Sequence, residues 1–345
     1  MNSIVKFLAT SGLLALVFTG RAPAQAAPPA PNKNFHIYLC FGQSNMEGFP
    51  IRDAATWAEL QKDVDPRFQL LAAVDFTPSD RSALKEARKA GAWYVAVPPL
   101  CRPDSGLSPV DFFGRTLVAN LPKEIRVGVV SVAVAGCKIE TFDKVGYQAE
   151  MAKWAPGDFK VNIAKQYGGN PYQRLVELGK EAQKTGVIKG ILLHQGESNS
   201  GDKEWPNKVK AIYEDLLKDL NLKAAEVPLL AGEVVAKDQG GGTAGMNAII
   251  DELPKAIPTA HVISAEGCTP ANSLHFDPAG YRELGTRYAV AMIPLLGLKP
   301  LDRQPVIAPP RPAAPARGGR GRGQGAPPAA PAPATTAPGT PPPQA

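Results

Sequence analysis

The sequence contains few of the side chains that most often bind metal ions. Only four cysteines and four histidines occur among its 345 residues. The cysteines form no C-x-x-C pair, and their spacing matches no metal-binding pattern. A G-x-S-x-G segment, which marks the nucleophile of ordinary α/β-hydrolases, is also absent. We therefore predict no metal and no cofactor, and we exclude that hydrolase class.

Long apolar runs are also lacking, and none is long enough to be a good membrane span. The apolar stretch of residues 7–20 follows Lys6 and precedes Ala24-Gln25-Ala26, which supplies the small residues that a signal peptidase needs. We expect residues 1–26 to be a signal peptide, with a membrane-anchored signal as the minor alternative. The mature protein is then secreted or periplasmic, without stable membrane insertion.

Export makes disulfide formation possible, because the cell envelope is more oxidising than the cytosol. Cys40 stands in an apolar run and is expected to be a buried free thiol. One disulfide among Cys101, Cys137 and Cys268 is compatible with export, and the sequence does not say which pair would form it.

Residues 303–345 contain no acidic residue and are dominated by proline, alanine, glycine and arginine. Such a segment has too few large apolar side chains to offset the entropy of ordering the chain, so we predict a disordered tail. Its R-G-G-R-G-R-G core (317–323) resembles an RNA-binding tract. A solvated linker, or weak attachment to an anionic envelope polymer, is the favoured interpretation for an exported protein.

The charge of the chain is concentrated at its two ends. The formal net charge is +6, but five arginines lie in the tail and two cations lie in the signal peptide, which leaves about −1 for residues 27–302. Nothing electrostatic marks this part as a nucleic-acid binder. Its length suffices for one domain with a sizeable core.

Short apolar runs alternate with helical patterns along this domain. The runs predicted to be buried strands are 35–41, 125–135, 187–195, 227–235 and 260–267. The predicted helices are 110–121, 172–186, 209–220, 246–257 and 279–296. This alternation predicts an α/β fold with a parallel sheet between two layers of helices. Residues 49–110 and 141–171 have irregular patterns and remain unassigned.

Polar residues gather where the predicted strands end, which is where parallel sheets bind ligands. The first cluster, residues 41–48 (FGQSNMEG), contains Ser44. This serine is either a nucleophile or a helix cap. A nucleophile needs a base, and His275 is the best candidate because it lies in a loop after the last predicted strand. His36 and His261 start strands at the opposite edge, and His194 stands in an apolar run typical of the core.

Three segments together resemble the SGNH (GDSL-like) hydrolases, and within them the sialate O-acetylesterase domain and the related carbohydrate esterase family six. They are G-Q-S-N-M (42–46), H-Q-G-E-S (194–198) and L-H-F-D-P-A-G-Y (274–281). The resemblance runs from about residue 35 to about residue 291. It implies a three-layer α/β/α, flavodoxin-like fold. It also implies a serine esterase that removes acetyl groups from carbohydrates without a metal.

The resemblance assigns roles to individual positions. Ser44 corresponds to the nucleophile and His275 to the general base. The backbone N–H of Gly136 and the side chain of Gln195 correspond to donors that join the Ser44 N–H in an oxyanion hole. Such donors stabilise the negative charge that forms on the acetyl oxygen during attack.

The residue that orients His275 does not follow from the resemblance alone, because the family often has Asp three residues before its histidine and this chain has Asn272. Three candidates remain. Glu197 ranks first because some relatives use the Glu of this segment. Asn272 ranks second, since an amide oxygen can accept from the ring. Asp277 ranks third, because it precedes a proline and is typical of a helix cap.

Other polar and aromatic residues near these segments allow two interpretations each. Glu140, Asn45 and Asn199 either line the site or cap turns, and Glu47 and Trp205 either contact a sugar or pack. The favoured function is a secreted carbohydrate acetylesterase. The alternatives are a glycan-binding relative without activity, and a lipase or thioesterase of the same superfamily.

Overall fold

The computed structural model describes residues 30–49, 54–78 and 86–312. The predicted signal peptide (1–26) and residues 313–345 of the predicted tail lie outside these ranges. One compact unit ends at Pro310. Among the described residues, no helix combines the length and the apolar character needed to cross a membrane.

Seven strands in the described ranges form one mixed sheet in the order β3-β2-β4-β1-β5-β6-β7. The strands are β1 (Phe35–Gly42), β2 (Phe68–Leu71), β3 (Trp93–Val95), β4 (Arg126–Ala133), β5 (Val187–His194), β6 (Leu229–Gly232) and β7 (Ala260–Ile263). All pairs are parallel except β2 with β3. The five predicted strands are confirmed, and in sheet order they are β4-β1-β5-β6-β7. This is the 2-1-3-4-5 order of flavodoxin-like folds.

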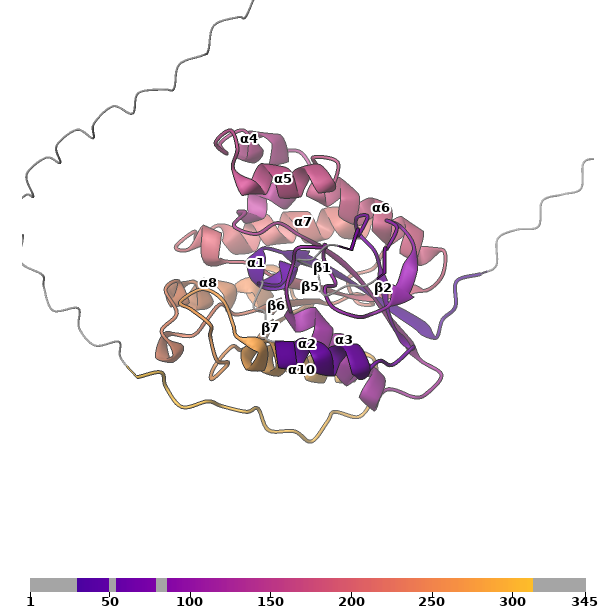
Figure 1. Ribbon diagram of the computed structural model, residues 1–345. Helices are drawn as coiled ribbons and strands as arrows, with labels where there is room; N and C mark the ends of the chain where they lie inside the picture. Colours follow the sequence, from indigo (N-terminus) through magenta and orange to yellow (C-terminus); the bar gives the residue numbers. More distant parts are fainter. Residues whose placement is uncertain (1–29, 50–53, 79–85, 313–345) are drawn as a thin grey trace, which may run out of the picture. The chain divides into compact units, whose positions relative to one another are not determined.

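Helices cover both faces of the sheet, which confirms the three-layer prediction (Figure 1). Side chains of α5 (Phe159–Gln166), α6 (Pro171–Gln183), α7 (Trp205–Asp219), α8 (Asn247–Ile250) and α9 (Leu253–Ala256) pack on one face. Side chains of α1 (Ser44–Glu47), α2 (Ala54–Lys62), α3 (Pro109–Asn120) and α10 (Pro278–Leu295) pack on the other. The short helix α4 (Tyr147–Met151) precedes α5.

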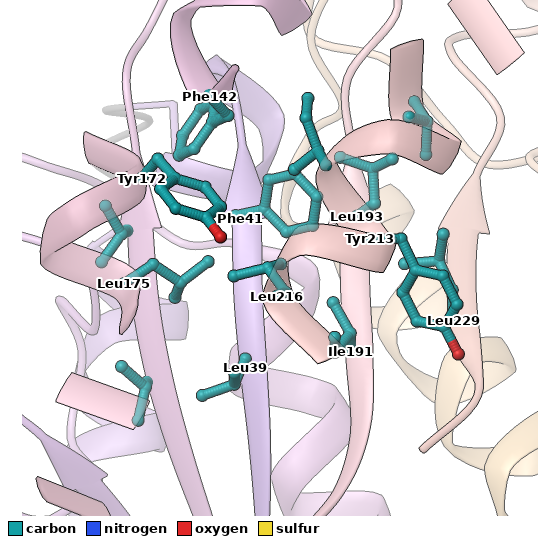
Figure 2. Packing of buried hydrophobic residues seen from close by; sticks show 14 of the residues in the cluster. Leu39, Phe41, Phe142, Tyr172, Leu175, Ile191, Leu193, Tyr213, Leu216 and Leu229 are labelled. Carbon is teal, nitrogen blue, oxygen red and sulfur yellow. The ribbon is translucent and has the colours of Figure 1, made fainter. Parts of the chain in front are cut away.

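Alternating side chains of the central strands feed the two cores, because successive residues of a strand point to opposite faces. Leu39 and Phe41 of β1 lie in the α6–α7 core, where they pack with Leu175 and Leu216 (Figure 2). Tyr38 and Cys40 lie in the opposite core. The strand is therefore buried on both faces, as its unbroken apolar run predicts.

The predicted helix 246–257 is wrong as a single element. The structure has α8 and α9 with a turn between them. Pro254 is the cause, because it has no N–H to donate to the carbonyl of Ile250 and its ring crowds that carbonyl. Pro254 instead occupies the first turn of α9, where a missing N–H costs nothing.

The predicted tail begins later than residue 303. Arg303 pairs with Glu283 of α10 at 2.5 Å, and the Ala308 N–H donates to the Gly267 carbonyl at 3.2 Å. The side-chain amide of Gln239 donates to the Pro309 carbonyl at 2.9 Å. Composition alone missed these contacts, because they use backbone carbonyls and one ion pair instead of large apolar side chains.

All four cysteines are buried free thiols, so the disulfide considered above does not form. Cys137 lies in the core on the α6–α7 face, whereas Cys40, Cys101 and Cys268 lie in the core on the α3–α10 face. The sheet thus separates Cys137 from the other three. Burial raises the pKa of Cys101 to about 11 and that of Cys268 to about 12, which keeps both thiols protonated.

Candidate active site

Ser44 is the first residue of α1, directly after β1. Gly42 has φ +151°, and a Cβ at this position would lie 2.1 Å from the His194 carbonyl oxygen, so only glycine lets the ends of β1 and β5 approach this closely. The Gln43 N–H donates to the same carbonyl at 3.1 Å. Because β4 and β5 lie on opposite sides of β1, Ser44 sits at the point where the strand order reverses, which is where such sheets bind ligands.

His275 lies in the loop between β7 and α10 and reaches Ser44 across the end of the sheet. Its Nε2 is 2.9 Å from the Ser44 Oγ. The ring of Phe49 stacks on the imidazole with the ring centroids 3.9 Å apart and the planes 9° from parallel. Burial lowers the pKa of His275, so the ring is neutral near pH 7 and can accept a proton.

Asn272 contacts the other nitrogen of the His275 ring, with Oδ1 3.2 Å from Nδ1. The same oxygen accepts the backbone N–H groups of Leu274 and His275, each at 2.9 Å. These donors identify it as the amide oxygen, so Nδ1 carries the ring proton. The free lone pair of Nε2 then faces the Ser44 hydroxyl.

Glu197, the first candidate for orienting His275, contacts other groups. Its Oε1 accepts a hydrogen bond from the Asn45 side chain and lies 3.8 Å from His194 Nε2. Its Oε2 is buried and has no partner among the described residues. Burial raises the pKa of Glu197 to about 7. Asn272, ranked second from the sequence, therefore replaces Glu197 as the residue that orients His275, because its amide oxygen contacts Nδ1 of the ring.

Asp277, the third candidate, caps a helix as its sequence context predicts. Its side chain accepts the Gly280 N–H at 2.8 Å at the start of α10 and the Thr269 hydroxyl at 2.6 Å. It makes no hydrogen bond with His275.

Asn45 holds the loop of His275 on both sides of the histidine. Its Nδ2 donates to the Leu274 carbonyl at 2.9 Å, and its Oδ1 accepts the Phe276 N–H at 3.4 Å and the Tyr281 hydroxyl at 2.8 Å. Asn45 is fully buried and does not line the cavity. The residue after the nucleophile thus fixes the segment that carries the base.

A cavity of about 450 Å³ opens beside the Ser44–His275 pair. This volume is in the range of small-molecule sites. The residues that line it are Gln43, Ser44, Glu47, Gly48, Phe49, Arg102, Asp104, Ala135, Gly136, Phe159, Ile163, Glu197, Ser198, Thr243, Leu274 and His275. Its walls are partly aromatic, with Phe49 on one side and the half-exposed Phe159 near Gly136.

Two backbone N–H groups at the cavity are free to donate. Within the described ranges, neither the Ser44 N–H nor the Gly136 N–H has an acceptor. The Ser44 amide begins a helix, so it has no partner inside that helix. Gly136 has φ +70°, a conformation that favours glycine. Both residues line the cavity, as the sequence predicts for oxyanion donors.

Gln195 does not reach the cavity, contrary to the role that the resemblance gave it. It is fully buried, and its oxygen accepts the Trp205 indole N–H. Its Nε2 donates to Asn199 Oδ1 at 2.7 Å and to Gln43 Oε1 at 3.1 Å. All of its polar atoms are therefore used inside the fold.

Gln43 takes the place at the cavity that was predicted for Gln195. Its oxygen accepts the Ser198 N–H at 3.2 Å as well as Gln195 Nε2. Because a backbone N–H can only donate, this contact fixes the orientation of the amide. The Gln43 Nε2 then has no acceptor in the part of the chain that the structure describes. The sequence signal for this residue is its position directly before Ser44.

Three of the remaining candidates are structural. Trp205 is fully buried, so it packs and does not contact a sugar. Asn199 accepts the Ile139 N–H at 2.8 Å, and its Nδ2 donates to Glu140 at 3.0 Å. Neither Asn199 nor Glu140 lines the cavity. Their network with Lys208 supports the loop that follows β5.

Glu47 does line the cavity, but both of its oxygens are bonded. Arg102 Nη2 donates to Oε1 at 2.5 Å, and the Ala135 N–H donates to Oε2 at 2.8 Å. Burial raises the pKa of Glu47, and the guanidinium of Arg102 acts in the opposite direction. Through its bond with Ala135, Glu47 links α1, which carries Ser44, to the segment that carries Gly136.

The other histidines lie where the sequence predicts. His36 and His261 are the second residues of β1 and β7, at the edge of the sheet opposite Ser44. His194 is a fully buried core residue, and burial lowers its pKa to about 3. Neither ring nitrogen of His194 has a hydrogen-bond partner among the described residues.

Solved structures share this fold at low sequence identity. A protein from Arabidopsis thaliana matches at 20% identity with a TM-score of 0.54, over 75% of this chain and 98% of that one. NanS matches at 16% with a TM-score of 0.52, over 78% and 99%. A carbohydrate acetylesterase from Xanthomonas citri matches at 18% with a TM-score of 0.50, over 74% and 55%.

The sequence itself matches a protein-family model over residues 34–294, which is most of the chain and includes both Ser44 and His275. That family is described as carbohydrate esterase, sialic acid-specific acetylesterase. The chain belongs to this family of carboxylic ester hydrolases.

Proposed function

We propose that the protein is a secreted or periplasmic serine esterase that removes O-acetyl groups from carbohydrates through an acetyl-enzyme. The observation that carries this proposal is the 2.9 Å contact between Ser44 Oγ and His275 Nε2 beside a cavity. The family match supports the carbohydrate acetyl ester as substrate. The signal-like sequence of residues 1–26 supports export.

In the first step, the Ser44 Oγ attacks the acetyl carbonyl carbon while its proton passes to His275 Nε2. The carbonyl oxygen becomes an oxyanion. When this tetrahedral intermediate collapses, the bond to the sugar oxygen breaks and His275 gives the proton to that oxygen. The sugar leaves with a free hydroxyl, and the acetyl group stays on Ser44 as an ester.

In the second step, water attacks the acetyl-Ser44 ester and gives one proton to His275 Nε2. The second tetrahedral intermediate releases acetate and returns the proton to Ser44 Oγ. Asn272 keeps the proton on Nδ1 throughout, which leaves Nε2 available as the base. Its neutral amide stabilises the imidazolium less than a carboxylate would.

Three donors are assigned to the oxyanion in both steps: the N–H groups of Ser44 and Gly136 and the side-chain amide of Gln43. Each is free to donate, as described above, and each residue lines the cavity. Fixed donors of this kind stabilise the charge as it forms without a cost for reorienting solvent. The half-buried setting strengthens their effect.

Acetate release from acetylated xylan, acetylated sialic acid and acetylated simple sugars tests the proposal. Purified protein is expected to release acetate from at least one of them, and Ser44→Ala and His275→Ala are expected to lose this activity. Binding of these sugars without acetate release would instead support a glycan-binding protein. Faster hydrolysis of octanoyl than of acetyl esters would support a lipase or thioesterase.

The location of the protein is tested by its mature N-terminus. Export predicts that protein isolated from the medium or the periplasm begins near residue 27. Recovery of full-length chain from the cytoplasm alone would contradict export and leave the esterase proposal untouched.

A further inference from the structure

The charges around the cavity carry information about the substrate. Among the described lining residues, Arg102 is the only permanent cation, and Glu47, Asp104 and Glu197 are acidic. A sugar that carries a carboxylate, such as a uronic or sialic acid, needs a cation that is free to pair with it. The question is whether Arg102 is free.

Arg102 is already paired inside the protein. Its Nη2 lies 2.5 Å from the Glu47 carboxylate, and only 11% of its side chain is exposed. Its Nε is buried, so an incoming carboxylate cannot form the side-on pair of hydrogen bonds that uses Nε and Nη2. A second anion at this guanidinium would also be repelled by Glu47.

Asp104 adds a negative charge beside this pair. It is exposed, lines the cavity and has no ion-pair partner among the residues that the structure describes. With Glu47 ionised, the three residues Glu47, Arg102 and Asp104 carry one net negative charge. With Glu47 protonated, Arg102 and Asp104 balance. The fixed charge at this wall is therefore never positive.

Another cation close to the cavity is Lys160, which follows Phe159 on α5 and whose Cδ would lie 3.7 Å from a Cβ at Gly136. Its Nζ pairs with Asp158 at 3.2 Å and lies 5.3 Å from the centre of the Trp154 ring. The charge of Lys160 is thus balanced by its own neighbour.

The exposed apolar side chains that line the cavity suit a neutral sugar. Phe159 is 57% exposed although it lines the cavity, and its ring lies close to Gly136, where a Cβ would be 3.1 Å away. An exposed aromatic face can pack on the apolar face of a sugar ring. Leu274, next to His275 in the chain, is a second exposed apolar residue of the lining, at 37% exposure.

From these charges and contacts we infer that the site prefers acetyl esters of neutral sugars to those of sugars that carry a carboxylate, and that Asp104 sets part of this preference. The inference rests on the proposed esterase function. It narrows the substrate class within it, since the family description names sialic acid, which is anionic.

The test compares two substrates that differ only at C6, which carries a neutral hydroxymethyl group in an acetylated methyl glucoside and a carboxylate in the equivalent acetylated methyl glucuronoside. We expect kcat/KM to be about three- to tenfold higher for the glucoside at low salt, because one like charge at this range has an effect of that order. The difference is expected to shrink as salt screens the charges. Acetylated sialic acid is measured beside them.

Asp104→Asn is expected to reduce the ratio between the two substrates by about threefold or more. Glu214→Gln is the matched control, because it changes the net charge equally at an exposed residue of α7 that does not line the cavity. It is expected to leave the ratio unchanged.

Equal or faster hydrolysis of the glucuronoside or of acetylated sialic acid would overturn the inference, and so would an equal response of the ratio to Asp104→Asn and Glu214→Gln. These outcomes leave the esterase proposal intact as long as hydrolysis depends on Ser44. Absence of hydrolysis of every acetyl ester would instead refute the proposed function, and this inference with it.

Discussion

The Oγ of Ser44 and the Nε2 of His275 are 2.9 Å apart although 231 positions separate the two residues in the chain. The parallel sheet produces this contact, because it brings the segments after β1 and β7 to the same edge. Asn45 and Asn272 then fix the loop of His275 from two sides. Each of these contacts leads to a prediction.

Asn272→Asp is expected to raise turnover by about tenfold, because a carboxylate at Nδ1 stabilises the imidazolium better than an amide does. It is also expected to raise the pKa of His275. Since the neutral ring is the active form, activity rises as pH rises through this pKa, and the acidic limb of the pH–rate profile should move to higher pH. The profile of kcat/KM against pH measures both effects. Loss of activity in Asn272→Asp, together with a strong loss in Glu197→Gln, would return the orienting role to Glu197.

Gln43→Glu is expected to lower kcat by roughly a hundred- to a thousandfold with a smaller change in KM, as for other oxyanion donors. The variant keeps the size of the side chain and the oxygen that accepts the Ser198 N–H, but it removes the free amide donor. Steady-state kinetics on an acetyl ester measure the loss, and thermal unfolding checks that the fold is intact. Wild-type turnover in a folded Gln43→Glu protein would rule out this role.

Asn45→Ala is expected to lower kcat and to destabilise the fold by about 1–3 kcal/mol, because it removes the donor to the Leu274 carbonyl and the acceptor of the buried Tyr281 hydroxyl. Tyr281→Phe removes one of these bonds only and serves as the control, with a smaller expected loss of kcat. Denaturant unfolding and kinetics measure the two effects. If both variants lose stability equally and keep full kcat, Asn45 has no part in placing His275.

Glu197 should make stability depend on pH in a specific window. Its pKa is about 7 in the fold and near 4.5 in the unfolded chain, so the folded state holds the proton more tightly. The free energy of unfolding therefore contains a contribution that is fully present below pH 4.5 and is lost as pH rises to 7, on the order of 3 kcal/mol. Glu197→Gln lacks this contribution.

Other buried carboxyls titrate in the same range, so the measured quantity is the difference between wild type and Glu197→Gln. Denaturant unfolding at pH 4.5, 6 and 8 is expected to show wild type losing stability relative to the variant as pH rises. A constant difference across these pH values would show that the pKa of Glu197 is not raised.

The central strands and long helices were predictable because burial on both faces gives unbroken apolar runs, and one buried face gives a helical period. The strands β2 and β3, which form one side of the sheet, were missed. They are short, and β3 is partly exposed, so their sequences lack a long apolar run. The contact between Ser44 and His275 followed from strand ends and from the small number of histidines.

The roles of Gln43, Gln195, Glu197 and Asn272 depend on the three-dimensional arrangement of the loops. Gln195 and Gln43 are the same residue type at the ends of adjacent strands, and only the hydrogen bonds from Trp205 and Ser198 show which amide faces the cavity. Glu197 and Asn272 likewise both follow predicted strands that end at the edge of the sheet where His275 lies, so the sequence allowed either to contact the imidazole. Loop geometry decided between them, and no sequence pattern encodes that geometry directly.

The most direct test of the account asks whether Ser44 becomes acetylated. Wild-type, His275→Ala and Ser44→Ala proteins react with an acetyl ester and are quenched in acid, and the mass of the peptide that contains residue 44 is then measured. An acetyl group on Ser44 in wild type, and none in the His275→Ala protein or in Ser44→Ala, is the predicted result. Rapid acetate release by a Ser44→Ala protein, with no acetyl group on wild-type Ser44, would contradict it.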